Sequence, residues 1–421
     1  MTVQKLRARV IAAALIAVCA TLPAHSQTDP AAALFGGTTL IDLRLRFEDV
    51  DLKTRTRRAY ANTLRARIGF VTGDYHGFSA LVEGDFIGHL DSGHYNDTLN
   101  GRVRFPVIAD PDMAALNRLQ LNYATALTPA AATLGRKDLN IIAGRQRIML
   151  GDQRFIGNAG WRQHEQTYDA VSVADTSIPA TTLTYAYVAG VNRVFGPASP
   201  MGHFDSNSHL FNAAYTGFGP DLAIEAYDYL LDLRQVPLLS TASYGARFTS
   251  TIPIAPDLTA QLNGAYARQT PYGANPLQFD LGYYLAEAGL SWAGLSGTAG
   301  YEVLGGNGVI GFSTPLASFH LFQGSAEQFL TDPPDGVRDL YGRARYAFPL
   351  PAISGNAAAT VVYHSFRADH VSLAYGDEWD GSLEAFFPNG TMLGAAFGDF
   401  AARGGGFASK SAFWLYAGYH Y

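Results

Sequence analysis

The sequence has little cysteine, few charged residues and no long apolar run beyond its N-terminus. Its one cysteine, Cys19, lies near the start, so the rest of the chain has neither a disulfide framework nor thiol chemistry. Charged residues make up 16% of the chain and the net charge is −6, which excludes a generic nucleic-acid-binding protein. After the first residues no clean apolar stretch reaches the length of a membrane-spanning helix, so helical spanning is unsupported.

The N-terminus has the features of a secretory signal peptide. Three basic residues precede an apolar run over residues 10–20, and a small-residue cleavage site follows at residues 24–26. We therefore expect residues 1–26 to be removed on export and residues 27–421 to form a single barrel domain. Because the leader contains three positive and no negative charges, its removal changes the net charge from −6 to −9.

The residues that are abundant indicate a β-rich protein with an apolar surface. The chain contains 44 glycines and 12% aromatic residues, which is typical of many short strands joined by tight turns. Its basic residues are 26 Arg and 4 Lys. Either the base composition of the genome or a use for planar guanidinium groups explains this bias.

Alternation of apolar and charged residues is the main structural signal. In residues 39–47, Leu43 and Leu45 lie on one face of a strand, and Arg44 and Arg46 lie on the opposite face. Later segments repeat the pattern, and their charged faces contain Arg65, Arg67, Glu83, Asp85, Arg343 and Arg345. Similar segments recur as far as the C-terminus. They predict about 18 strands of the length that a tilted membrane-crossing strand requires.

The connections between these segments alternate in length. Short turns rich in Gly, Pro, Asn and Asp lie at residues 73–77, 177–180, 217–220, 253–256, 293–294 and 388–390. Long polar links lie between them, at residues 91–117, 151–167, 193–208, 270–280 and 304–336. Outer-membrane barrels alternate short periplasmic turns and long outer loops in this way, whereas a soluble sandwich has no reason to do so. The link 126–138 is longer than the pattern predicts.

The last strand gives a second indication. Phe413, Leu415, Tyr419 and the terminal Tyr421 share one face, as in the C-terminal signal by which the barrel-assembly machinery recognises outer-membrane proteins. An ordinary final strand is the alternative. The sequence therefore predicts an all-β protein of the bacterial outer membrane, a transmembrane antiparallel up-and-down β-barrel of about 18 strands in contact with membrane lipid.

The barrel prediction fixes the direction of the charged faces. An Arg at the midplane of the lipid face costs about 2–4 kcal/mol, but in a water-filled lumen it costs little. We therefore expect the charged faces to line the lumen, where rings of Arg select anions and rings of carboxylates select cations.

The segment 144–173, GRQRIMLGDQRFIGNAGWRQHEQTYDAVSV, concentrates polar side chains between two strand-like pieces. It contains several candidate pore-lining residues: Arg145, Arg147, Asp152, Arg154, Arg162, Glu165 and Asp169. Guanidinium groups suit carboxylates and phosphates, so residues 151–167 are the best candidate for a constricting loop folded into the lumen. The alternative is that these ion pairs only hold the wall and the loop together. If Arg145 faces the lumen, Gln146 faces lipid, unless the strand ends or bulges there.

This segment resembles the signature of the alginate export family of outer-membrane β-barrels. Two further segments resemble the same family, FHLFQGSAEQFLTDPPDGVRDLY at residues 319–341 and VVYHSFRADHVSLAYGDEWD at residues 361–380. Together the three cover less than a quarter of the chain. The resemblance implies a barrel that passes a polyuronate outward through an Arg-lined pore, with Arg145, Arg147, Arg154 and Arg162 in the matching segment.

Other chemistry finds little support in the sequence. His364 and Ser365 are neighbours in a strand, so they point to opposite faces and do not form a simple catalytic pair. We find no zinc spacing, EF-hand pattern or phosphate-binding glycine loop, and expect no catalytic residue, metal or cofactor. We expect an outer-membrane channel for an anionic polysaccharide or small anionic solutes. A barrel hydrolase and a plugged structural or adhesive barrel are the alternatives.

Overall fold

The computed structural model describes residues 29–91, 93–125, 138–219 and 221–421. The expected signal peptide and most of the link 126–138 lie outside the described residues. The strands are β1 Thr38–Leu52, β2 Ala59–Val71, β3 Phe78–His89, β4 Met113–Ala124, β5 Leu139–Gln146, β6 Thr167–Asp175, β7 Thr181–Asn192, β8 His203–Tyr215, β9 Leu222–Leu231, β10 Thr241–Ala255, β11 Leu258–Pro271, β12 Leu281–Trp292, β13 Leu295–Leu304, β14 Val337–Leu350, β15 Gly355–Arg367, β16 Ala374–Phe386, β17 Thr391–Ala402 and β18 Lys410–His420. The helices are α2 Pro30–Phe35 and the 3-10 turns Pro237–Leu239, Phe319–Leu321 and Pro351–Ile353.

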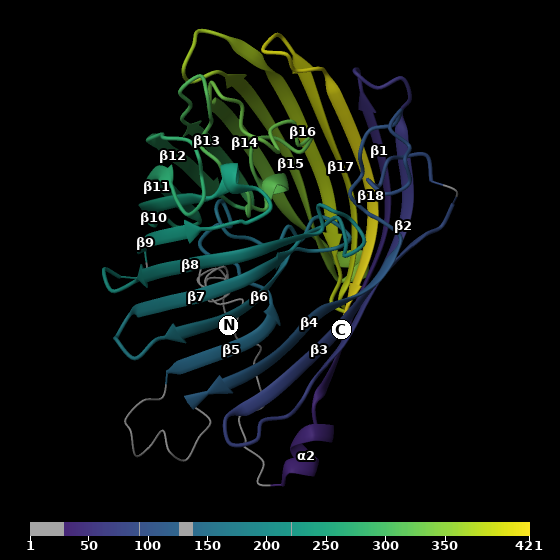
Figure 1. The fold of residues 1–421 in the computed structure, drawn as a ribbon, viewed down its shortest axis with the longest axis vertical. Helices are drawn as coiled ribbons and strands as arrows, with labels where there is room; N and C mark the ends of the chain where they lie inside the picture. Colours follow the sequence, from purple (N-terminus) through teal and green to yellow (C-terminus); the bar gives the residue numbers. More distant parts are fainter. Residues whose placement is uncertain (1–28, 92, 126–137, 220) are drawn as a thin grey trace.

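The strands form one closed antiparallel sheet. Each strand pairs with its neighbours in sequence, and β1 also pairs with β18, from Asp42 opposite His420 to Leu52 opposite Lys410. Closure leaves no free strand edge in the described sheet (Figure 1), so the backbone groups of the ladder bond within the wall except at bulges such as the one between Val188 and Gly190. The predicted fold class and the expected number of strands, 18, are therefore confirmed.

Short and long connections lie at opposite ends of the barrel, as the sequence predicts. The short turns join β2–β3, β6–β7, β8–β9, β10–β11, β12–β13, β14–β15 and β16–β17. The longest links join β3–β4, β5–β6 and β13–β14 at the other end. The link 126–138 joins β4 to β5 at the short-turn end. The helix α2 lies at this end too (Figure 1), where the Gly73 amide donates to the Ala33 carbonyl at 2.8 Å.

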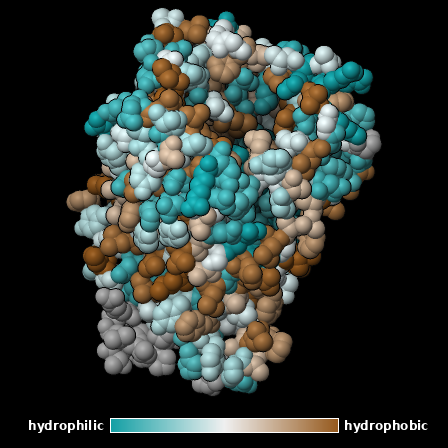
Figure 2. Space-filling view, in the orientation of Figure 1, coloured by the Kyte–Doolittle hydropathy of each residue, from teal (hydrophilic) through white to brown (hydrophobic). Residues whose placement is uncertain are grey.

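The outer face of the wall is apolar and the inner face is polar, which is the reverse of a soluble protein. On β2, the apolar Leu64 and Ile68 are 41% and 50% exposed, whereas Arg65 and Arg67 between them are each only 4% exposed. Figure 2 shows apolar side chains gathered across the lower half of one outer face. The apolar outer wall and the polar interior match a barrel surrounded by hydrocarbon.

Two smaller features agree with this orientation. On β18, Phe413, Leu415 and Tyr419 are exposed on the outer wall, so the last strand has the apolar face expected from the sequence. Among the described residues, no helix is both long enough and apolar enough to cross a membrane.

Sidedness can be tested at two adjacent positions of β15. Val361 is 47% exposed on the outer wall, and Val362 lies opposite Arg343 and Asp380 on the inner wall. Val361→Arg should lower the free energy of unfolding in lipid vesicles by about 2–4 kcal/mol, because it places a cation in hydrocarbon. Val362→Arg is the matched control and should change it much less. Urea unfolding followed by tryptophan fluorescence measures both, and equal losses would contradict the assigned sidedness.

Candidate functional site

The loop between β5 and β6, residues 147–166, folds into the barrel, and we call it the first inner loop. Its side chains and backbone reach the inner faces of β1 and β2. Arg44 Nε donates to Gln163 Oε1 at 2.8 Å, and Gln163 Nε2 donates to Thr63 Oγ1 at 2.8 Å. Arg46 Nη1 donates to the Trp161 carbonyl at 2.5 Å. The expectation that residues 151–167 fold inward agrees with this geometry.

A second inner loop, residues 305–336 between β13 and β14, packs against the first. The Gly157 amide donates to the Leu316 carbonyl at 2.8 Å, and the Ala159 amide donates to Ser318 Oγ at 3.0 Å. Arg162 of the first loop forms an ion pair with Glu327 of the second. The two loops therefore form one connected body inside the barrel.

Apolar side chains anchor the first inner loop. Ile156 is fully buried, and the Phe155 ring lies 5.1 Å from the Tyr227 ring and 5.4 Å from the Tyr283 ring. Both tyrosines face inward, from β9 and β12. Full burial of Ile156 stabilises the loop in the lumen by roughly 1.5–3 kcal/mol, and the partly buried Phe155 adds less. The adjacent Phe155 and Ile156 thus explain why a polar loop folds inward.

Buried ion pairs connect the loops to the wall. Arg154 Nε lies 2.7 Å from Glu302 Oε1 of β13, and both side chains are almost fully buried. Arg162 lies 3.2 Å from Glu48 of β1. Asp110, in the β3–β4 loop, forms an ion pair with Arg46 and accepts a hydrogen bond from the backbone amide of Gln163 at 3.0 Å. Removing one partner of such a buried pair strongly destabilises a protein. These pairs therefore fix the position of the loops.

Glu165 lies at the centre of a second group of charges. Arg147 Nη2 lies 2.6 Å from it, Arg67 Nη1 lies 3.4 Å away, and Asn117 donates to it at 2.6 Å. Burial alone would raise the pKa of Glu165, but the charges of Arg147 and Arg67 and these hydrogen bonds hold it well below its usual value. Glu165 therefore remains ionised and neutralises the surrounding arginines.

Most of the residues predicted to line the pore face the barrel interior, but two do not. Arg145 pairs in register with Leu119, which is 53% exposed on the outer wall, and Asp169 pairs with Arg145. The prediction that these two residues line the lumen is wrong. They form an ion pair at 2.8 Å on the outer wall, close to the long-loop ends of β5 and β6.

The prediction for Gln146 is also corrected. It lies on the inner face, 1% exposed, and donates to the Ile142 and Ala170 carbonyls at 3.1 and 3.0 Å. The strand does end at Gln146, which was one of the expected alternatives. The other outward residues of β5 near Arg145 are Ala143 and Ile141. This apolar face is too short for the sequence to show which side of the strand faces the lumen.

Three inward arginines form no ion pair with a carboxylate in the part of the chain that the structure describes. Arg44 of β1 is bonded to Gln163 and to two backbone carbonyls. Arg343 of β14 is exposed to the interior, and Arg345 is partly exposed. Arg247 of β10, by contrast, lies 3.0 Å from Asp152. The positive charge of the lumen that is not neutralised thus includes Arg44, Arg343 and Arg345.

Several residues of this network were not selected from the sequence. They are Glu48, Asp110, Asn117, Arg118, Glu302 and Glu327. Glu48 and Glu302 lie on the charged faces of strands, so alternation alone could have identified them. Asp110 and Glu327 lie in loops, where no periodic signal exists.

The candidate catalytic residues do not form a catalytic group. His364 Nδ1 lies 2.8 Å from Asp339 and its Nε2 lies 3.4 Å from Asp380, all on the inner face. Ser365 is paired with Leu340 of the outer wall, as the alternation predicts. Within residues 29–421, excluding the undescribed gaps, no group of His, Cys, Asp and Glu is placed to hold a metal ion.

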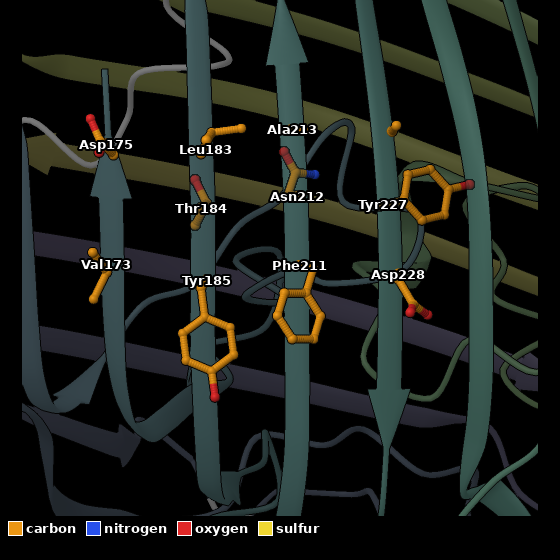
Figure 3. Close-up of a pocket in the computed structure, with 11 residues that line it drawn as sticks. Val173, Asp175, Leu183, Thr184, Tyr185, Phe211, Asn212, Ala213, Tyr227 and Asp228 are labelled. Atoms are coloured by element: carbon orange, nitrogen blue, oxygen red, sulfur yellow. The ribbon is translucent and has the colours of Figure 1, made fainter. Parts of the chain in front are cut away.

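A depression of about 500 Å³ on β6–β9 lies on the outer wall and does not belong to this site. Figure 3 shows Tyr185 and Phe211 on adjacent strands within it. Phe211 is 45% exposed and lies opposite Asp228. This surface therefore faces away from the lumen.

The buried pair of Arg154 and Glu302 provides a stability test. Arg154→Met should destabilise the protein by about 3–5 kcal/mol, because it leaves the Glu302 carboxylate buried without its partner. The double variant Arg154→Met with Glu302→Leu should recover much of this loss. Unfolding in detergent, with hydrogen exchange of the first inner loop, measures both. A double variant as unstable as the single one would show that the pair does not anchor the loop.

Asp332 of the second inner loop provides a pH test. Burial raises the pKa of Asp332 to about 7, and its Oδ1 has no hydrogen-bond partner among the described residues. The folded loop therefore holds a proton that the unfolded chain releases near pH 4, so stability should fall as the pH rises from about 4 to 7. Asp332→Asn should flatten this dependence. Hydrogen exchange of residues 305–336 at pH 5 and 8 measures it, and the same slope in both proteins would contradict the prediction.

Comparison with known proteins shows similarity of fold only. The sequence matches no family model and no curated protein. Similar solved structures include OccAB3 of Acinetobacter baumannii, with 13% identity, a TM-score of 0.70 and coverage of 91% of this chain and 99% of that one. OpdK of Pseudomonas aeruginosa, solved with vanillate, has 14% identity, a TM-score of 0.66 and coverage of 92% and 99%. The shared barrel fold and the apolar outer wall agree with the outer-membrane location expected from the sequence.

Proposed function

We propose that the protein is a passive outer-membrane channel for small anionic solutes. The observation on which this depends is that two inner loops occupy part of the lumen while Arg44, Arg343 and Arg345 remain without a carboxylate partner among the described residues. The loops narrow the path, and the unneutralised arginines attract anions along it. No covalent chemistry or cofactor is required.

The ion-paired arginines have a different role in this proposal. Arg67, Arg147, Arg154 and Arg162 each lie within 3.4 Å of a carboxylate, so most of their charge is already neutralised. They hold the inner loops in place and shape the constriction. The solute contacts mainly Arg343 and Arg345, because all three donor nitrogens of Arg44 already bond to Gln163 and two backbone carbonyls.

Size favours a small solute over a polymer. The inner loops are fixed to β1, β2 and β13 by buried bonds, so an extended chain would have to pass beside a rigid body. The similar barrel OpdK was solved with vanillate, a small carboxylate. A chain of uronate units is the second candidate, supported by the resemblance of residues 144–173, 319–341 and 361–380 to the alginate export family. Each uronate presents the same carboxylate to the arginines.

The route to the membrane is part of the proposal. Residues 1–26 direct export, and the apolar face of β18, which ends at Tyr421, is recognised by the barrel-assembly machinery. Membrane lipid then covers the outer wall.

A plugged, non-conducting barrel is the competing function, and the dense bonding of the inner loops favours it. Single-channel recording in a planar bilayer separates the two functions. The proposal predicts open conductance and a reversal potential in a salt gradient that shows anion preference. A closed barrel predicts no current.

Charge reversal tests the selectivity. Arg343→Glu combined with Arg345→Glu should shift the reversal potential toward that of a cation-selective pore, since the wall then attracts cations. A change of about 1.4 kcal/mol in interaction energy alters the permeability ratio about tenfold. Arg145→Glu combined with Asp169→Arg is the matched control, because it exchanges the two charges of an outer-wall ion pair and should leave selectivity unchanged. An unaltered reversal potential in the double variant would exclude β14 from the conducting path.

A further inference from the structure

Basic residues gather at one position on the long-loop rim. The loop between β1 and β2 and the facing part of the β3–β4 loop together contain six of the chain's 30 basic residues: Lys53, Arg55, Arg57, Arg58, Arg102 and Arg104. The two loops pack together, since Arg55 Nη1 donates to the Val103 carbonyl at 3.0 Å. We call this group the basic rim. It is a local excess of positive charge on a chain whose net charge is −6.

Only part of this charge is neutralised. Lys53 lies 2.6 Å from Asp51, and Arg58 lies 2.5 Å from Asp49. Arg55, Arg57 and Arg104 form no ion pair with a carboxylate in the described part of the chain, although all three are exposed. Like charges on two adjacent loops repel one another, so an anion bound between them would be stabilised.

The basic rim lies directly above the lipid-facing wall. Asp49 pairs in register with Phe413, which is 38% exposed on the outer wall, so Asp49 and its partner Arg58 also lie on the outside. Below them on β1 are Phe47 and Leu45, which face lipid.

An apolar groove of about 620 Å³ lies on the outer wall below the basic rim and extends toward the short-turn ends of β16 and β17. Leu45, Phe47, Leu383, Leu393 and Leu415 line it, and the small Ala395 lies between Leu383 and Leu415 on the adjacent strands. Its upper end at Phe47 is one outward position below Asp49, a rise of about 7 Å along the strand. A groove of this kind fits an acyl chain.

The depression on β6–β9 shows what distinguishes this groove. It is also apolar and lies on the outer wall, but Asp175 and Asp228 are among its lining residues (Figure 3). It lies at the short-turn end of the wall, where β6 ends at Asp175. Proximity to a cluster of basic residues is therefore a property of the groove below the basic rim and not of that depression.

We propose that the basic rim and the groove below it form a binding site for a phosphorylated, multiply acylated lipid of the outer leaflet. Arg55, Arg57 and Arg104 bind its phosphates, and the groove on β16, β17, β18 and β1 holds an acyl chain. The proposal depends on the outer-membrane location but not on conduction, so the bilayer recordings and the binding measurement below can fail independently.

Lipid binding to the full chain in detergent tests the site. The probe is bisphosphorylated hexa-acyl lipid A, measured by native mass spectrometry and by titration. The triple variant Arg55→Gln, Arg57→Gln, Arg104→Gln should bind at least tenfold more weakly, since each basic residue beside an anionic lipid contributes about fivefold. Ala395→Phe, which fills the groove, should also weaken binding. Arg268→Gln is the matched control, because this exposed outer-wall arginine is already paired with Asp280.

Two further probes separate the sources of binding. Lipid A without its phosphates should bind weakly, and millimolar inorganic phosphate should not displace the intact lipid. Heat-dependent gel mobility shows that each variant is folded. Equal affinity of the triple variant, equal binding of the dephosphorylated lipid, or full displacement by inorganic phosphate would each overturn the proposal.

Discussion

The cost of placing a guanidinium group in hydrocarbon governs this structure. Arginines recur at every second position of several strands, and an outward orientation at the midplane would cost about 2–4 kcal/mol for each. Turning them inward requires a wall that closes on itself around a polar interior, and the pairing of β1 with β18 provides that closure. The outward charges Arg145 and Asp169 obey the same rule, because they neutralise one another close to the long-loop end of their strands.

The same charges then build the interior. Carboxylates from strands and loops neutralise most inward arginines, and these pairs hold two long loops inside the barrel. The lumen is therefore shaped by ion pairs that a solute does not need to break. In the proposed channel, selectivity depends on the few arginines left over, chiefly Arg343 and Arg345, so the residues that make the constriction differ from those that attract the solute.

Sequence alternation predicted the architecture well and the site only in part. Where apolar outward residues are large, as beside Arg65 and Arg67, the direction of each strand was predictable. On β5 the short face of Ile141 and Ala143 gave no such information, so Arg145 was placed on the wrong side. The partners Asp110 and Glu327 could not be predicted, because contacts between distant loops have no period in the sequence. The ion pair of Arg154 with Glu302 of β13 could not be predicted either, because it depends on the closed fold.

Cysteine labelling along β14 tests the central claim most directly, since the only native cysteine, Cys19, precedes the barrel. Single cysteines at positions 343, 344, 345 and 346 would be exposed to a charged, membrane-impermeant thiol reagent in lipid bilayers while current is recorded. The account predicts that positions 343 and 345 react and that the current changes, whereas positions 344 and 346 stay unreactive in lipid. Reaction at 344 and 346 with none at 343 and 345 would place the arginines on the outer wall and contradict the account.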